Sequence, residues 1–149
     1  MTINENIDRL TLHTVLTRVA EAKTAKDKKA VLLKHNSLAL RNLLRGAFDD
    51  SVEWNIPEGT PPYRQADEIH CQHIRKHTKK LRYMVKGGEG DGMSPAKREK
   101  MFINFIEIIH PDDAKLTILM KDKALDGKFK GLTKKLVTET FADVNLIRK

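Results

Sequence analysis

Apolar residues recur at intervals of three and four along most of this 149-residue chain, and strict alternation over the length of a strand is hard to find. This spacing is typical of amphipathic helices. It is clearest between Leu40 and Phe48, where apolar side chains at i, i+3, i+4, i+7 and i+8 form one buried face. The sequence therefore predicts an all-α fold.

Capping residues divide the chain into about six or seven helices of a single compact domain, residues 1–149. Thr24 with Asp27 fits a capping box, and Ser94 with Pro95 fits the start of a helix that is apolar on nearly all sides and is expected at the centre. The helices are predicted over residues 11–22, from Thr24 through Leu33, from the break at His35 and Asn36 through Phe48, over 67–85, from Ser94 through Ile109, from Pro111 through Met120 and from Thr133 through Phe141. We expect residues 1–10 to be a flexible N-terminus and residues 86–93 a flexible glycine-rich loop.

A proline-rich loop after the third helix interrupts the helical spacing over residues 49–66. Four residues there disfavour a helix, namely Pro57, Gly59, Pro61 and Pro62. Because Trp54, Ile56 and Tyr63 are unfavourable in water, we expect an ordered loop that folds back over the helices. In an alternative hypothesis, Trp54, Pro61, Pro62 and Tyr63 anchor a protein partner, since Trp and Tyr are frequent hot-spot residues. Exposure of Trp54 would favour the partner site, and burial a structural loop.

The composition favours a protein of a reducing cytoplasm. Cys71 is the single cysteine, which excludes an internal disulfide, and the first 20 residues lack the pattern of a signal peptide. The longest strongly apolar stretch, residues 101–109, contains Asn104 and Glu107 and is far shorter than the ~20 residues that span a bilayer. No membrane role is expected.

Three groups of residues resemble chemical sites without completing one. His70, Cys71, His73 and His77 are zinc-type ligands, but Cys71 projects away from His70 on a helix and no second pair at ligand spacing exists. The glycines of residues 87–92 match neither phosphate-binding fingerprint. Asp49, Asp50 and Glu53 are carboxylates at a helix end, where a solvated cap is the simpler interpretation. We expect no catalytic residue, metal site or cofactor; a deep cleft joining Asp49 or Asp50 to His70 or His73 would favour an enzyme instead.

Positive charge is concentrated in the middle of the chain. The net charge is +8, and residues 71–100 carry nine basic and three acidic side chains. No acid occurs from Cys71 to Gly88, a stretch that we call the basic segment; its basic residues are Arg75, Lys76, Lys79, Lys80, Arg82 and Lys86. In the predicted helix over residues 67–85, Arg75, Lys79, Arg82 and Lys86 follow i, i+4, i+7 and i+11 along one face. Neutralising about six phosphates would give binding to duplex DNA a log–log salt slope near −5.

Three stretches of sequence together resemble a known group of proteins. They are the run LRNLLRGAFD from Leu40, the segment WNIPEGTPPY from Trp54, and the stretch from Lys97 to Phe141, in which Lys130 to Lys134 reads KGLTK. Over roughly residues 23–141 the chain resembles an uncharacterised family of small proteins from large contractile-tailed bacteriophages. The resemblance implies a protein made in the cytoplasm of an infected bacterium, and it carries over no functional residue.

These observations lead to a ranked hypothesis of function. The first choice is a non-enzymatic phage accessory protein whose basic helix, residues 67–85, contacts nucleic acid or an acidic surface of a nucleic-acid-handling host enzyme such as RNA polymerase. The second is a protein-interaction module that inhibits a host enzyme or defence system through the loop of residues 54–63.

Overall fold

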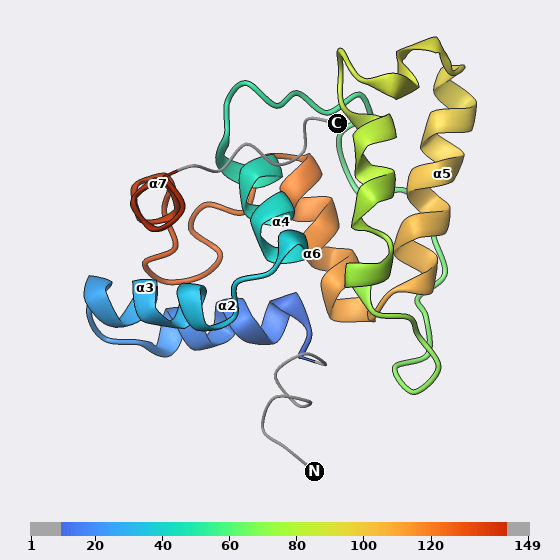
Figure 1. Cartoon of the computed structure of the whole chain (residues 1–149). Helices are drawn as coiled ribbons and strands as arrows, with labels where there is room; N and C mark the ends of the chain where they lie inside the picture. The colour runs from blue at the N-terminus through green and yellow to red at the C-terminus, as the bar shows by residue number, and fades with distance from the viewer. Residues whose placement is uncertain (1–9, 143–149) are drawn as a thin grey trace.

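The computed structural model describes residues 10–142 and confirms the all-α fold. Within these residues the chain forms six α-helices and three 3-10 helices (Figure 1). The elements are α2 (Leu12–Glu21), α3 (Ala25–Lys34), α4 (Leu38–Phe48), η1 (Ile74–Lys76), η2 (Thr78–Met84), η3 (Glu89–Gly92), α5 (Pro95–Ile108), α6 (Pro111–Lys121) and α7 (Lys134–Thr140). Apart from Leu10, the expected flexible N-terminus at residues 1–10 lies outside the described residues.

Short hydroxyl side chains start most of the α-helices. Thr11, Thr24, Ser37, Ser94 and Thr133 are the N-caps of α2, α3, α4, α5 and α7, and each side chain accepts a hydrogen bond from an amide of the first turn. Such caps satisfy amides that have no partner inside the helix. They explain why the predicted starts of these five helices agree with the structure.

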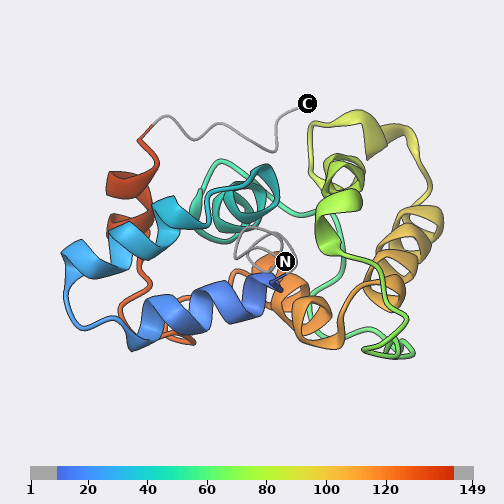
Figure 2. The same cartoon turned by 60° about the horizontal axis from the view of Figure 1, so that its bottom comes forward.

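The centre of the molecule is built by α4 and α6, not by α5. Most residues of α4 and α6 are buried, and the two helices pack against each other. The expectation of a central α5 was wrong, because α5 packs against α6 and η2 and leaves a side toward solvent, with Asn104 exposed. The two views agree that α5 lies with η2 at one end of the molecule and α7 with α3 at the other (Figures 1 and 2).

The proline-rich loop is ordered and is held to the helices at two places. The indole N–H of Trp54 donates to the carbonyl oxygen of Gly46 at 2.9 Å. Farther along the loop, the buried Lys121 ammonium donates to the carbonyl oxygens of Pro57 and Gly59, both at 2.9 Å, and the Gly59 amide donates to the Asp122 carboxylate. The expectation of an ordered loop that covers the helices is confirmed.

The predicted α-helix over residues 67–85 was wrong. Residues 67–73 are not helical, and the helical part is 3-10 in η1 and η2. Since a 3-10 helix has three residues per turn, Thr78, Leu81 and Met84 align on one side, and all three are buried. The basic face drawn with α-helical spacing therefore does not exist.

Tertiary pairing explains this local geometry. The backbone of Gln72 pairs with Ile109, and that of Val85 pairs with Trp54, so the segment is fixed at both ends. A 3-10 helix rises about 2.0 Å per residue against 1.5 Å for an α-helix and covers more length with the same residues. Repulsion between lysines or arginines four apart, as in Lys76 and Lys80, further disfavours the α-helix.

The glycine-rich segment at residues 86–93 is more structured than a flexible loop. It contains η3, whose Gly90 is buried against the backbone of η2. The buried Arg98 guanidinium donates to the carbonyl oxygens of Gly90 and Met93, and the Asp91 carboxylate accepts from the Gly87 amide. The segment thus has defined contacts that fix the end of η2.

Two short strings that carried the family resemblance have structural roles. Gly59 and Gly131 both adopt positive φ, of 97° and 78°, which favours glycine. A Cβ on Gly131 would also lie 2.4 Å from Cε of the buried Lys28, whose ammonium donates to the last carbonyl oxygens of α2. These residues are therefore explained by folding.

Candidate nucleic-acid interface

Three of the six predicted basic residues are exposed and make no ion pair within residues 10–142. They are Lys76, Lys79 and Lys80. We call these three residues the lysine strip. Because η1 and η2 are fixed at both ends by backbone pairing, the strip has a defined backbone position, with its ammonium groups in water.

Two other basic residues of the segment already form ion pairs within the fold. Arg82 Nε lies 3.2 Å from a Glu89 carboxylate oxygen, and Lys86 Nζ lies 3.8 Å from a Glu53 carboxylate oxygen. The Arg82 guanidinium also lies 5.4 Å from the centre of the Tyr83 ring. Both pairs are solvent-exposed and contribute little to stability, but they reduce the positive potential at this end of the segment.

The sixth residue, Arg75, lies in a cluster that the sequence did not reveal. Arg75, Arg18 of α2 and Lys34 of α3 all act electrostatically on the imidazole of His35, which is only 5% exposed. Burial first, and then these three cations, lowers the pKa of His35. Arg18 and Lys34 are exposed and far from Arg75 in the sequence, so only the fold brings them together.

A second histidine lies inside the basic segment. His77 is partly buried, and its Nε2 lies 2.6 Å from the Gln72 side-chain oxygen. Burial, followed by the charges of Lys80 and Lys76, lowers the pKa of His77. The ring therefore remains neutral near pH 7, and the positive charge of the strip comes from its lysines.

The four residues of the suspected metal cluster point to different partners. His70 Nδ1 lies 3.0 Å from the Asp67 carboxylate, and His73 Nε2 lies 3.0 Å from the carbonyl oxygen of Leu10. His77 contacts Gln72, and Cys71 Sγ donates to the Glu68 carbonyl. Over residues 10–142 no three side chains of His, Cys, Asp or Glu are grouped to hold a metal ion.

The lone thiol is also poorly suited to act as a nucleophile. Partial burial raises the pKa of Cys71, and the nearby carboxylates of Asp113, Asp67 and Glu68 act in the same direction. Since the thiolate is the reactive form, the thiol stays protonated and unreactive near pH 7.

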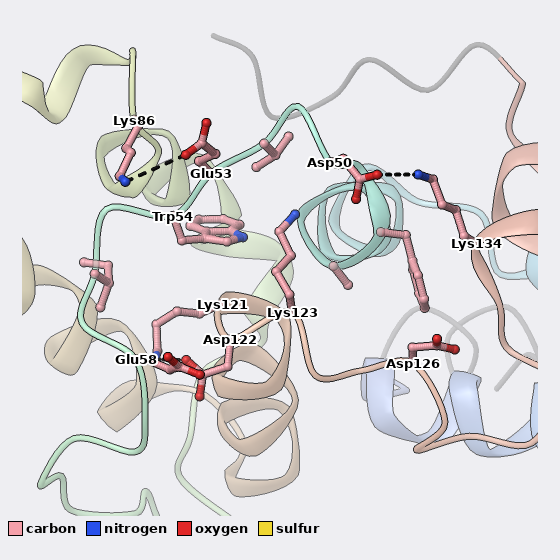
Figure 3. Close-up of a pocket in the computed structure, with 14 residues that line it drawn as sticks. Asp50, Glu53, Trp54, Glu58, Lys86, Lys121, Asp122, Lys123, Asp126 and Lys134 are labelled. Carbon is pink, nitrogen blue, oxygen red and sulfur yellow. Dashed lines mark hydrogen bonds and ion pairs between the residues drawn. The ribbon is translucent and has the colours of Figure 1, made fainter.

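A charged cleft of about 610 Å³ lies between the proline-rich loop and the end of α6 (Figure 3). Its charged lining residues are Asp50, Glu53, Glu58, Lys86, Lys121, Asp122, Lys123, Asp126 and Lys134. Most of them are paired: Lys134 with Asp50 at 2.8 Å, Lys86 with Glu53, and Lys121 with Asp122. Their mutual neutralisation makes the cleft a weaker site for an anion than the lysine strip.

Lys123 is the most unusual residue of this cleft. It has a positive φ of 57°, and its ammonium donates to the Asp49 carbonyl oxygen at 2.8 Å, at the end of α4. Burial lowers the pKa of Lys123, although Asp49 and Asp50 oppose the shift. The cleft lining includes Asp50 but no histidine, so the cleft does not join that carboxylate to His70 or His73.

The structure favours the structural interpretation of the loop over the partner site. Trp54 is 9% exposed, and the only polar atom of its side chain is bonded to the Gly46 carbonyl oxygen. Tyr63 and Pro61 are half-buried, and Pro62 is exposed. Trp54 is therefore not available at the surface as an anchor.

Comparison with known proteins places the chain in one family. Residues 15–127 match the sequence profile described as "Family of unknown function (DUF6433)". The chain belongs to this family. The DUF6433 match confirms the expected membership of an uncharacterised family. The matched residues include the whole basic segment and end before Gly131 and α7. No curated protein and no solved structure matches the chain.

Among residues 10–142 of this DUF6433 chain, no helix combines the length and the apolar composition that crossing a bilayer requires.

Proposed function

We propose that this protein is a non-enzymatic accessory protein of a bacteriophage, acting in the cytoplasm of the infected bacterium by binding the phosphate backbone of nucleic acid through the lysine strip. The phage context rests on the sequence resemblance described above. The binding role rests on one observation: Lys76, Lys79 and Lys80 are exposed, make no ion pair with any residue of the described part of the chain, and lie in a segment without acids.

The three lysines of the strip lie close together along the chain. Lys76 is the last residue of η1, and Lys79 and Lys80 lie in the first turn of η2, with His77 between the two 3-10 helices. Phosphates along one strand of a duplex advance about 3.4 Å per nucleotide along its axis. Cations this close along the chain suit neighbouring phosphates of one strand.

The structure also changes the expected salt dependence of binding. Arg82 and Lys86 pair with Glu89 and Glu53, so they are not counted as free contacts. Three lysines that neutralise three phosphates give a log–log salt slope of about −2.7, in place of the value near −5 for six contacts. Such binding is independent of sequence, because phosphate contacts carry no base information.

The test compares two triple variants of equal charge. Lys76→Glu, Lys79→Glu and Lys80→Glu remove the strip, whereas Lys115→Glu, Lys128→Glu and Lys130→Glu change three exposed lysines elsewhere. Each variant lowers the net charge by six, from +8 to +2. Binding to a fluorescent duplex of about 20 base pairs is measured by anisotropy.

The proposal predicts that the strip variant loses at least about tenfold in affinity while the control keeps most of its affinity. Equal losses in both variants would mean that only net charge matters, and would overturn the assignment to the strip. Circular dichroism of both variants checks that the helices are retained.

A pull-down from infected cells distinguishes nucleic acid from a nucleic-acid-handling enzyme. The proposal predicts that treatment with nuclease releases the material bound to the tagged protein. Stoichiometric retention of an acidic protein after nuclease, lost in the strip variant, would overturn nucleic acid as the ligand of the strip.

A further inference from the structure

The lysine strip is followed by an aromatic side chain on the same side of η2. Lys80 and Tyr83 are three residues apart within η2, and side chains three apart lie above one another in a 3-10 helix. Lys80 is exposed, and Tyr83 is half-buried. One side of η2 therefore presents an ammonium group and then an aromatic ring.

The ring of Tyr83 lies outside the apolar core. The chain has two tyrosines, and among residues 10–142 Tyr63 packs against the core whereas Tyr83 does not. The buried side of η2 is formed instead by Thr78, Leu81 and Met84. Packing of the core therefore does not explain an aromatic side chain at this position. Proteins that bind single-stranded nucleic acid combine cations for the backbone with aromatic rings on which bases stack.

A guanidinium group lies beside this ring. Arg82 Cζ is 5.4 Å from the centre of the Tyr83 ring. Arg82 Nε lies 3.2 Å from a carboxylate oxygen of Glu89, which restrains the guanidinium from the other side. Bases stack on arginine guanidinium planes as well as on aromatic rings. We call Arg82 and Tyr83 the stacking pair.

The charges around the stacking pair differ from those around the lysine strip. Residues next to each other in the sequence always lie close, so the contact within the pair would mean little alone. The pair also lies against η3, which supplies the acidic residues Glu89 and Asp91, whereas the basic segment contains no acid. Carboxylates repel a phosphate but not a neutral base. The strip thus suits phosphates, and the stacking pair suits a base.

We propose that the ligand of the lysine strip is a single strand of nucleic acid, one of whose bases stacks on Arg82 and Tyr83. The proposal rests on the proposed function, because it takes the phosphate contacts of the strip as given. The bases of a duplex are paired and stacked on each other, so a duplex makes the phosphate contacts alone. A single strand turns an unpaired base toward the stacking pair. Neither contact reads the sugar, so DNA and RNA strands bind alike.

The test measures fluorescence anisotropy with a single strand of about 15 nucleotides, without self-complementarity, and with the duplex of about 20 base pairs. Tyr83→Leu removes the ring and keeps an apolar side chain. It should weaken binding of the single strand by at least about fivefold, the contribution of one stacked base, and leave duplex binding unchanged. Arg82→Lys keeps the charge but removes the planar group, and the same pattern is expected.

Tyr63→Leu is the matched control, because it makes the same change in the half-buried tyrosine of the proline-rich loop. It should change the affinity for neither probe. Circular dichroism of all variants checks that the helices are retained.

NMR locates the stacked base independently of affinity. The ring resonances of the two tyrosines are assigned by their loss in Tyr83→Leu and Tyr63→Leu. The proposal predicts that the single strand moves the Tyr83 resonances upfield, because a stacked base places its ring current over them. The duplex should leave these resonances in place.

Three results would overturn the inference while leaving the proposed function intact. One is single-strand binding that depends on the lysine strip but is unchanged in Tyr83→Leu and Arg82→Lys. Another is an equal loss of both probes in Tyr83→Leu, which would give the ring a role in holding η2. The third is a preference of more than about tenfold for an RNA strand, which would mean that the 2′-hydroxyl is read. Absence of binding of both probes by the wild-type protein would overturn both proposals.

Discussion

The indole N–H of Trp54 donates to the carbonyl oxygen of Gly46 at 2.9 Å, near the C-terminal end of α4. Carbonyls in the last turn of a helix have no partner inside the helix, and here a side chain of the proline-rich loop provides one. The backbone of Trp54 also pairs with Val85. One residue thus connects α4, the loop and the end of the basic segment.

Trp54→Phe should destabilise the protein by about 1–3 kcal/mol, because it leaves the Gly46 carbonyl without its donor and removes part of a buried ring. Urea unfolding followed by circular dichroism measures the change. Ile69→Ala is the control, since Ile69 is 84% exposed, and a near-zero effect is expected there. Equal stability of Trp54→Phe and the wild type would contradict the role given to this bond.

Two glycines of η3 should respond differently to alanine. A Cβ on Gly90 would lie 1.7 Å from the carbonyl oxygen of Tyr83, whereas a Cβ on Gly92 would meet nothing within 4 Å. Gly90→Ala forces η3 away from η2 and should cost about 2–4 kcal/mol, while Gly92→Ala should change stability by less than about 1 kcal/mol. Thermal unfolding of the pair is the measurement, and similar midpoints would show that η3 does not pack as described.

The carboxylate of Asp113 caps a distant helix. Its two oxygens accept from the amides of Leu12 at 3.1 Å and His13 at 2.9 Å, at the start of α2. Asp113→Ala leaves both amides without this acceptor and should destabilise the protein by about 1–2 kcal/mol. Asp112→Ala changes the neighbouring, more exposed carboxylate, so its effect should be smaller. Urea midpoints in the reverse order would contradict the capping role.

Stability should fall as the pH drops below the ordinary histidine pKa of 6.5. The folded state lowers the pKa of His35 and His77, so the unfolded chain takes up protons first as the pH falls through this window. Once the pH has fallen below both the unfolded and the folded pKa of a histidine, each pKa unit between the two reduces the free energy of unfolding by about 1.4 kcal/mol. Burial raises the pKa of Asp113 above its ordinary value of 3.8. Protonation of this carboxyl in the folded protein opposes the loss of stability at lower pH.

Urea unfolding between about pH 7.5 and 5.5, followed by the fluorescence of the single tryptophan, measures this dependence. His35→Gln should flatten the profile, because a glutamine does not titrate. An unchanged profile in this variant would show that His35 is not a source of the pH dependence.

The sequence predicted the helices whose ends are set locally. Thr24, Ser37, Ser94 and Thr133 bond to amides three residues away, so their role is contained in a few neighbouring residues. The burial of Trp54 was also predictable, since a large aromatic side chain in an ordered loop is unfavourable in water.

The basic segment was mispredicted because distant contacts decide its geometry. Its apolar residues fit an α-helix, but pairing of Gln72 with Ile109 and of Val85 with Trp54 fixes both ends. The grouping of Arg18 and Lys34 around His35 was not accessible from the sequence for the same reason. The residue pattern within one segment does not show which distant segment packs against it.

Protection of lysines from acetylation by a bound duplex tests the central claim most directly, because it needs no substitution. The protein is acetylated with and without saturating duplex, and modified peptides are quantified by mass spectrometry. The account predicts protection of Lys76, Lys79 and Lys80, with Lys115, Lys128 and Lys130 modified equally in both samples. Equal modification of the three strip lysines while the duplex is bound would contradict it.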